Sequence, residues 1–235
     1  MSDYLLLWLE APLQSWGHDS KFGRRDSLDF PTKSGVLGLI CCARGAGGAE
    51  AEWLERWNHL DMQVLAFLGE DEFEGVLKKQ PLLHDFHMVG SGYDDSDPWQ
   101  NLLIPKTSEG KKAVGGGTKI THRYYLQDMA YAVILECPKG ECEAVAAALK
   151  APVWDLFLGR KSCPPTEFIY QGYFTEAAQA KSAALALAEQ KHRHLSFEVK
   201  QGALDVGEVL RLNDVPLQFG ERKRYKERVV TVVRE

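Results

Sequence analysis

The run YLLLWL, at residues 4–9, constrains the fold of this chain more than any other segment. Its side chains are large and apolar at successive positions, so a strand formed by them is apolar on both faces. Such a strand is typical of the centre of a sheet that other layers cover on each side. The sequence therefore predicts a layered protein with a central strand near its beginning.

The segments that follow predict an α+β fold. Thr32, just after Pro31, is a suitable N-cap for a helix, and Gly45 is suitable beyond the end of that helix. The predicted elements are, in chain order, helices at 34–43 and 51–60, strands at 62–68 and 81–89, strand-like segments at 122–126 and 129–137, and a helix at 141–150. This order is that of a ferredoxin-like core, also called an RNA-recognition-motif (RRM) core.

The chain is long enough for two regions, and we predict an RRM-like domain at residues 1–150 with a smaller, mostly β region at residues 151–235 packed on it. Residues 90–121 are rich in Gly, Ser, Asp and Lys, and they are too long for a simple connection in a compact domain. They predict a protruding, partly mobile loop or hairpin. The second region predicts a helix at 175–191 and strands near 195–200 and 227–233.

Composition excludes several classes of protein. No apolar run is long enough to span a bilayer, and the segment MSDYLLLWLEAP lacks the basic n-region of a signal peptide. The five cysteines include no repeated C-x-x-C pair, so neither a disulfide framework nor a zinc site is expected. We therefore expect a cytoplasmic protein that uses no membrane, metal or cofactor.

The charges are strongly segregated although the net charge is −5. Acidic residues are concentrated between residues 50 and 75. Basic residues gather at 21–25, 106–123, 160–161 and 222–228. A polyanion responds to the local potential, so this pattern is compatible with RNA binding. Ordinary solvated surface charge is the alternative interpretation of each cluster.

The segment FPTKSGVLGLICC, residues 30–42, combines features of an anion site with features of a buried helix. Lys33, Ser34 and the free amides at the start of a helix are suited to hold a phosphate. Gly35 and Gly38 would let the backbone approach a ligand closely. The alternative is a capped helix in which the glycines serve packing alone.

Two further patterns do not form sites. Residues 115–119, GGGTK, lack the spacing of a phosphate-binding P-loop, and a β-branched, aromatic segment follows them where a P-loop needs a helix. His84 and His87 are three residues apart on a predicted strand, so they point to opposite faces and do not share a metal ion.

A lysine, a histidine and a tyrosine occur close together as Lys119, His122 and Tyr125. Such a set can cleave RNA without a metal, because a general base takes the proton of the ribose 2′-OH and a cation stabilises the charged phosphorane. The same residue types also bind RNA through phosphates and stacked bases without cleaving it. An exposed basic strand edge is the third interpretation, and all three stay open at this point.

Five segments in order resemble a known family: LLLWLEAPLQSWG, FPTKSGVLGLI, THRYYLQDMAYAVIL, FLGRKSCPP and NDVPLQFGERKRYKERVV. They are similar to the CasD-type subunits of subtype I-E in type I CRISPR effector (Cascade) complexes, within the RAMP superfamily. The resemblance implies an RRM-type domain whose residues 90–121 form a thumb-like hairpin. It also implies a subunit that binds and caps the 5′ handle of the CRISPR RNA. Its neighbours would be the backbone-filament subunit, the large subunit and, in the assembled complex, target DNA.

The resemblance also implies a set of RNA-binding residues. Arg123, in the THRYYL segment, is the residue most expected to contact the handle, and Trp16 has a buried core position as its alternative. The full predicted set is Gln14, Ser15, Trp16, Arg24, Lys33, Ser34, Lys119, His122, Arg123, Arg160, Lys161, Arg222 and Arg224.

The related subtype I-C implies a different activity. Its equivalent subunit is a metal-independent endoribonuclease that cleaves CRISPR repeat RNA with a tyrosine, a lysine and a histidine. The I-E-like segments favour a non-catalytic subunit here, while Lys119, His122 and Tyr125 keep the nuclease as the alternative. The insertion GKKAVGGGTK departs from the family pattern at the base of the thumb.

Overall fold

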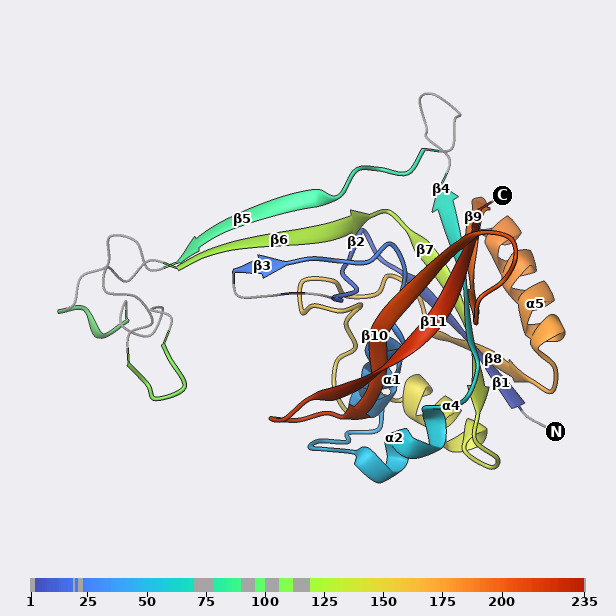
Figure 1. Ribbon diagram of the computed structural model, residues 1–235, viewed down its shortest axis with the longest axis horizontal. Coiled ribbons are helices and arrows are strands. Elements are labelled where there is room, and N and C mark those ends of the chain that lie inside the picture. Colours follow the sequence, from blue (N-terminus) through green and yellow to red (C-terminus); the bar gives the residue numbers. More distant parts are fainter. Residues whose placement is uncertain are drawn as a thin grey trace.

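The computed structural model describes residues 3–18, 20, 23–69, 78–89, 96–99, 106–111 and 119–234 (Figure 1). Most of the predicted thumb at 90–121, and with it most of GKKAVGGGTK, lies outside the described residues. No helix in the described part of the chain is long and apolar enough to cross a membrane.

A seven-stranded sheet forms the centre of the molecule, in the order β10-β11-β9-β4-β7-β1-β8. All of its pairings are antiparallel. The strands are β1 (Asp3–Glu10), β4 (Met62–Gly69), β7 (Ala130–Cys137), β8 (Tyr170–Phe174), β9 (Arg193–Gln201), β10 (Glu208–Gln218) and β11 (Arg224–Arg234). Strands of both predicted regions share this sheet, so the domain boundary near residue 150 stays a prediction.

Strand β1 is covered on both faces, as its sequence predicted. It lies between β7 and β8, and residues 5–9 are at most 1% exposed. Leu5, Leu7 and Leu9 belong to the larger core cluster, whereas Leu6 and Trp8 belong to a second cluster. Alternate side chains of β1 therefore pack into two separate cores, one on each face of the sheet.

Helices supply the two covering layers. Helix α5 (Ala177–Gln190) packs Ala180, Ala184 and Ala188 on the smaller core. On the other face lie α1 (Lys33–Ala43), α2 (Ala51–Trp57) and α4 (Cys142–Lys150). Thr32 caps α1 as predicted, since its Oγ1 accepts a hydrogen bond from the amide of Gly35 at 3.1 Å.

A smaller sheet projects from this body. It joins β2 (Leu13–Gln14), β6 (Lys119–Gln127) and β3 (Arg24–Arg25), and β5 (Leu83–Val89) pairs with β6. Figure 1 shows β5 and β6 extending well away from the layered body. We call this antiparallel pair the arm. It comprises the strands on either side of the predicted thumb segment.

The observed elements confirm the predicted mixed α+β class. The four predicted helices correspond to α1, α2, α4 and α5, with ends that differ by a few residues. Strands β8 and β10 were not predicted. In β8 the sequence YQGYF is short and contains a glycine, and β10 carries Pro216, which is typical of an edge strand.

Candidate nucleic-acid interface

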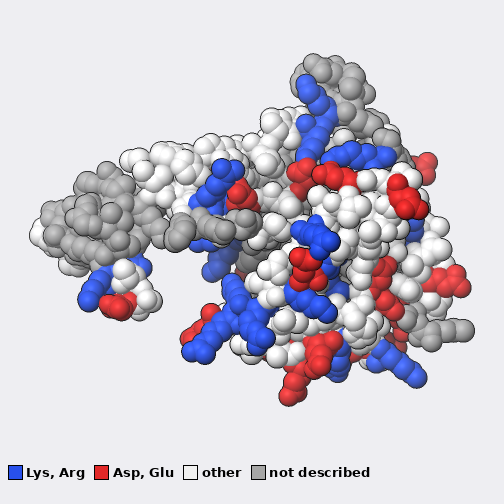
Figure 2. Space-filling view, viewed as in Figure 1, with Lys and Arg blue, Asp and Glu red and all other residues white. Residues whose placement is uncertain are grey.

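Five basic residues from three segments meet where the arm leaves the body, and we call them the arm-base cluster: Arg24, Arg25, Arg123, Arg160 and Lys161. Strand β3 runs parallel to β6, which sets Arg24 beside His122 and Arg25 beside Arg123. Figure 2 shows Lys and Arg side chains below the projecting arm and at the neighbouring end of the body. Residues far apart in sequence thus bring positive charge to the base of the arm, with Arg24 on the His122 face of β6 and Arg25 on the Arg123 face.

Arg160 forms hydrogen bonds with both of the other segments of this cluster. Its Nη1 donates to the carbonyl of Tyr124 at 3.2 Å and its Nη2 to the carbonyl of Arg25 at 2.8 Å. The guanidinium carbon lies 4.5 Å from the ring centroid of Tyr125. In the described part of the chain no carboxylate forms an ion pair with Arg25, Arg123 or Arg160, so their charges are available to an anionic ligand.

A glycine allows the Arg160 loop to lie against β2. Gly159 has φ +94°, and a Cβ built on it would lie 1.7 Å from the carbonyl oxygen of Ser15. The amide of Ser15 donates to the carbonyl of Leu158 at 3.1 Å, and Leu158 is fully buried. The segment FLGRKSCPP thus holds Arg160 and Lys161 in place through a close backbone contact that only glycine permits.

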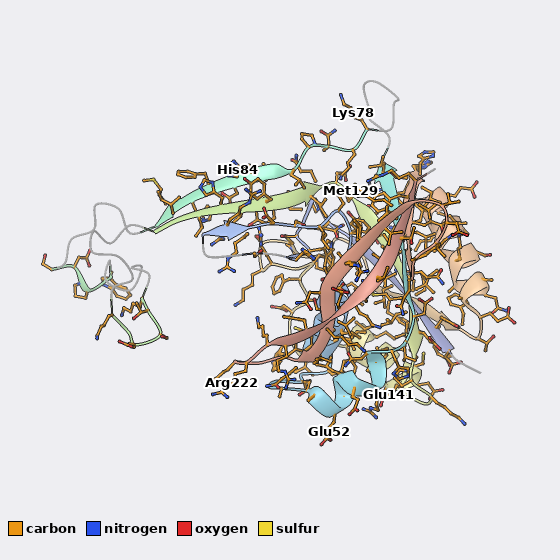
Figure 3. The ribbon with its side chains drawn as sticks, viewed as in Figure 1. Glu52, Lys78, His84, Met129, Glu141 and Arg222 are labelled. Atoms are coloured by element: carbon orange, nitrogen blue, oxygen red, sulfur yellow. The ribbon has the colours of Figure 1, made fainter. Side chains whose placement is uncertain are left out.

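A second basic group, the tip cluster, consists of Arg222, Lys223 and Arg224 near the β10–β11 turn, and all three are exposed. Figure 3 places Arg222 at this end of the body and His84 on the arm. A cavity of about 340 Å³ lies beside Lys223 of the tip cluster and Gly159, the residue before Arg160. Its lining comes from the start of α1, the Arg160 loop and the tip: Ser15, Trp16, Gly17, Thr32, Ser34, Gly35, Gly159, Phe219, Lys223 and Tyr225.

Lys33 does not face this cavity, which contradicts its predicted contact with a phosphate. The residue is fully buried, and its Nζ donates to the carbonyls of Asn58 at 3.1 Å and Leu60 at 2.6 Å. Its backbone amide donates to Oδ2 of Asp214 at 2.7 Å. Burial, and next the charge of Arg228, lower the pKa of Lys33 to about 8. The first helix amide is thus already bound within the protein.

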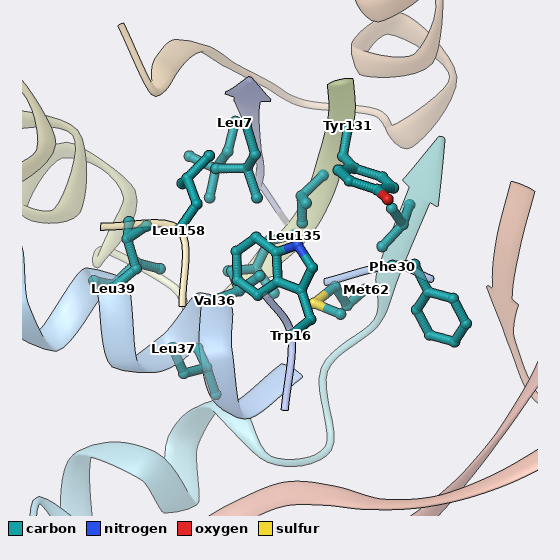
Figure 4. Packing of buried hydrophobic residues seen from close by; sticks show 14 of the residues in the cluster. Leu7, Trp16, Phe30, Val36, Leu37, Leu39, Met62, Tyr131, Leu135 and Leu158 are labelled. Carbon is teal, nitrogen blue, oxygen red and sulfur yellow. The ribbon is translucent and has the colours of Figure 1, made fainter. Parts of the chain in front are cut away.

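Gln14 and Trp16 are also buried, which contradicts a direct RNA contact of their polar atoms. The side-chain amide of Gln14 donates to the carbonyls of Leu9 at 3.2 Å and Met129 at 2.6 Å, and its Oε1 accepts from Nε1 of Trp16. Trp16 is 1% exposed, and Figure 4 shows its indole among apolar side chains of the core. The core alternative for Trp16 is the one observed. Ser15 is buried and donates to the carbonyl of Tyr124 at 3.3 Å.

The three residues of the alternative nuclease do not form one site. His122 and Tyr125 are three positions apart on β6 and therefore lie on opposite faces of the strand. Lys119 pairs in register with Val89, and the six residue steps from Lys119 to Tyr125 span roughly 20 Å along a strand. Tyr125 is 3% exposed and accepts a hydrogen bond from Oγ of Ser162 at 3.3 Å.

Tyr125 is buried against Ser162 and Arg160. Burial acts to raise the pKa of its phenol, but hydrogen bonds with Ser162 and Arg160 and the charge of Arg160 outweigh it and lower the pKa below the usual 10.0. His122 is engaged on the other face, because its Nδ1 lies 2.9 Å from Nε2 of His84.

Sequence reasoning missed one face of the arm. The pairing of β5 with β6 sets His84 beside Tyr124, Phe86 beside His122 and Met88 beside Ile120. We call these six residues the aromatic arm face. The signal was present in the alternation of LHDFHM and KITHRYY, but only the strand register shows that the two segments share a face. No group of three or more metal-ligating side chains occurs among the residues that the structure describes.

The comparisons with known proteins identify the family of this chain. The family model described as CRISPR-associated protein (Cas_Cas5) matches residues 4–232, so the chain belongs to this family. The resemblance predicted from the five sequence segments is thereby confirmed.

Individual relatives agree with this assignment. The chain is 27% identical over 175 residues to the "CRISPR system Cascade subunit CasD" of Escherichia coli (strain K12), a match that covers 73% of this chain and 71% of that protein. It is similar to a chain of a "CRISPR RNA-guided surveillance complex", with TM-score 0.71, 26% identity and coverage of 98% of this chain and 89% of that chain. A "Crystal structure of Cas protein", with TM-score 0.55, 24% identity and coverage of 97% and 93%, shares the fold.

Proposed function

We propose that this chain is a non-catalytic RNA-binding subunit of a type I CRISPR surveillance complex. In this proposal it binds and caps the 5′ handle of the CRISPR RNA, and it helps to anchor the large subunit and the backbone filament for DNA target recognition. The CasD relative is a Cascade subunit, and a similar solved chain comes from an RNA-guided complex.

One observation carries the proposal: the arm-base cluster is assembled and open to an anionic ligand. Arg160 donates hydrogen bonds to two backbone carbonyls, and these bonds fix the position of its guanidinium. Among the described residues this guanidinium has no carboxylate partner. A held guanidinium loses little conformational freedom when it binds a phosphate. The cavity beside Gly159 is lined by Lys223 of the tip cluster, which adds a second group of positive charges near the Arg160 loop.

The test is binding of a fluorescently labelled handle RNA at several salt concentrations. We expect affinity to fall steeply with salt, because phosphate contacts release counterions. Arg123→Ala and Arg160→Ala should each weaken binding and reduce the salt slope by about one unit. The matched control is Lys139→Ala, which removes an exposed positive charge beyond the far end of β7. Equal effects of Arg160→Ala and Lys139→Ala, or binding that ignores salt, would contradict the proposal.

The non-catalytic part has its own test. The protein is incubated with CRISPR repeat RNA in EDTA and the products are separated on a denaturing gel. We expect bound and intact RNA, since His122 and Tyr125 lie on opposite faces of β6. Specific cleavage that disappears in His122→Ala would establish the nuclease alternative instead.

A further inference from the structure

The aromatic arm face leaves large apolar groups in solvent. Phe86 is 52% exposed, Met88 is 53% exposed and Ile120 is 48% exposed, and all three lie on one side of the two-stranded arm. A contiguous exposed patch of this kind marks a binding surface more often than a single exposed apolar residue does. The pleat of the strands separates it from Arg123 and Tyr125, which point to the opposite face of β6.

Three rings of this face are nearly parallel. The plane of His84 lies 9° from that of Tyr124 and 13° from that of His122. The ring nitrogens of His84 and His122 are only 2.9 Å apart, whereas rings in face-to-face contact keep their atoms about 3.5 Å or more apart. The two imidazoles are therefore displaced sideways and joined by a hydrogen bond, so they form a broad surface. Phe86 continues it, with its centroid 5.3 Å from that of His122.

Positive charge borders this surface at its inner end. The guanidinium carbon of Arg24 lies 5.3 Å from the ring centroid of Tyr124, so this residue of the arm-base cluster lies beside the aromatic arm face. Arg24 also pairs with Asp26 at 2.9 Å. Rings in series beside cations are the arrangement with which proteins bind single-stranded nucleic acid, since bases stack on the rings and phosphates follow the cations.

We propose that the aromatic arm face is a stacking surface for unpaired bases of RNA, separate from the phosphate contacts of the arm-base cluster. This inference rests on the proposed function, because it requires that RNA reaches the arm. From His84 to Met88 the face is about 13 Å long, so it accommodates only a few nucleotides. Ring stacking tolerates any base, so the surface adds affinity without reading sequence.

The test uses handle RNAs that carry 2-aminopurine at one position each, because the fluorescence of this base is quenched when it stacks. With the full-length protein at saturation, we expect quenching at a few adjacent positions. Phe86→Ala should restore the fluorescence there and weaken binding by about fivefold or more. Phe86→Tyr, which keeps a ring, should retain both quenching and affinity.

Two controls separate this proposal from the proposed function. Phe168→Ala removes a ring that is 89% exposed elsewhere on the surface, and it should change neither signal. Arg160→Ala should weaken binding but leave the quenching intact once the RNA is saturated. Salt-dependent binding without quenching at any position, or equal effects of Phe86→Ala and Phe168→Ala, would overturn the stacking surface and leave the proposed function standing.

Two other outcomes would also overturn it. If Phe86→Ala leaves RNA binding unchanged but reduces copurification of other subunits of the complex, the face is a protein interface. If the wild-type protein binds no handle RNA at any salt concentration, the proposed function and the stacking surface fall together.

Discussion

Substitution of Gly159 by alanine tests how the candidate interface is built. Gly159 combines a positive φ of +94° with a backbone contact so close that a Cβ would lie 1.7 Å from the carbonyl oxygen of Ser15. An alanine at this position must therefore strain its own backbone and also push the Arg160 loop away from β2. The two costs have separate physical causes, and other glycines of this chain isolate the first of them.

The magnitude follows from these parts. A non-glycine residue at positive φ costs about 1–2 kcal/mol. Moving the loop also breaks the hydrogen bond from the Ser15 amide to Leu158, which costs about 1 kcal/mol or more, and it disturbs the packing of a fully buried leucine. We expect Gly159→Ala to lower the free energy of unfolding by about 3 kcal/mol or more.

Gly140→Ala and Gly202→Ala are the matched controls. Their φ values are +80° and +92°, and a Cβ at either position would meet nothing within 4 Å. In each control variant the free energy of unfolding should therefore fall only by the backbone strain of about 1–2 kcal/mol. The free energy of unfolding is measured for all variants by urea denaturation at one pH, with two optical probes to check that the transition is two-state.

Gly159→Ala should also weaken handle RNA binding under conditions where the variant is folded, because the displaced loop carries Arg160 and Lys161. The control variants should bind like the wild type. If Gly159→Ala is no less stable than Gly140→Ala and Gly202→Ala, the close contact with Ser15 does not constrain the loop and the reasoning is wrong.

Three further predictions concern the buried polar groups and the core. The pKa of Lys33 is lowered from 10.5 to about 8, so the folded protein releases this proton more readily than the unfolded chain does. The stability of the wild type relative to Lys33→Met should therefore rise by about 3 kcal/mol between pH 8 and pH 10.5, measured by urea denaturation, and a flat difference would contradict this. Asp214→Ala leaves the guanidinium of Arg228 buried without its carboxylate, whose oxygens accept at 2.7 Å and 2.8 Å. Asp214→Ala should lower the free energy of unfolding by about 3–5 kcal/mol. A decrease below about 1 kcal/mol would show that water replaces the carboxylate. Trp16→Ala should cost about 3–5 kcal/mol by creating a cavity, and an unchanged thermal midpoint would refute its core position.

Much of the fold follows from local pattern. The apolar residues of β1 need cover on both faces wherever the strand lies, so its central position was predictable and is observed. Thr32 caps α1 through a contact only three residues long. Strand β10 was missed although it forms a hairpin with the next strand, β11, because Pro216 and the Asn213–Asp214 pair favour a turn when read alone.

The features of the candidate site also separate into those that the sequence predicted and those that depend on tertiary structure. The sequence by itself identified the residue types, the family resemblance and most of the basic residues, because these depend on composition and order along the chain. Tertiary structure alone decided which of them meet. The parallel pairing of β3 with β6 brings Arg25 to Arg123, and the guanidinium of Arg160 binds the carbonyls of Arg25 and Tyr124.

Tertiary structure also decided which way the side chains point. A lysine after a helix cap is suited to bind a phosphate, but the local sequence does not show whether other groups of the protein already bind its ammonium. In this fold two carbonyls, 25 and 27 residues away, take the ammonium of Lys33 into the interior. The register of β5 on β6 likewise turns two unremarkable segments into one aromatic face. Local sequence therefore determined what each segment can do, and long-range packing determined which of these capacities the surface presents, because burial and pairing depend on residues that are far apart in the chain.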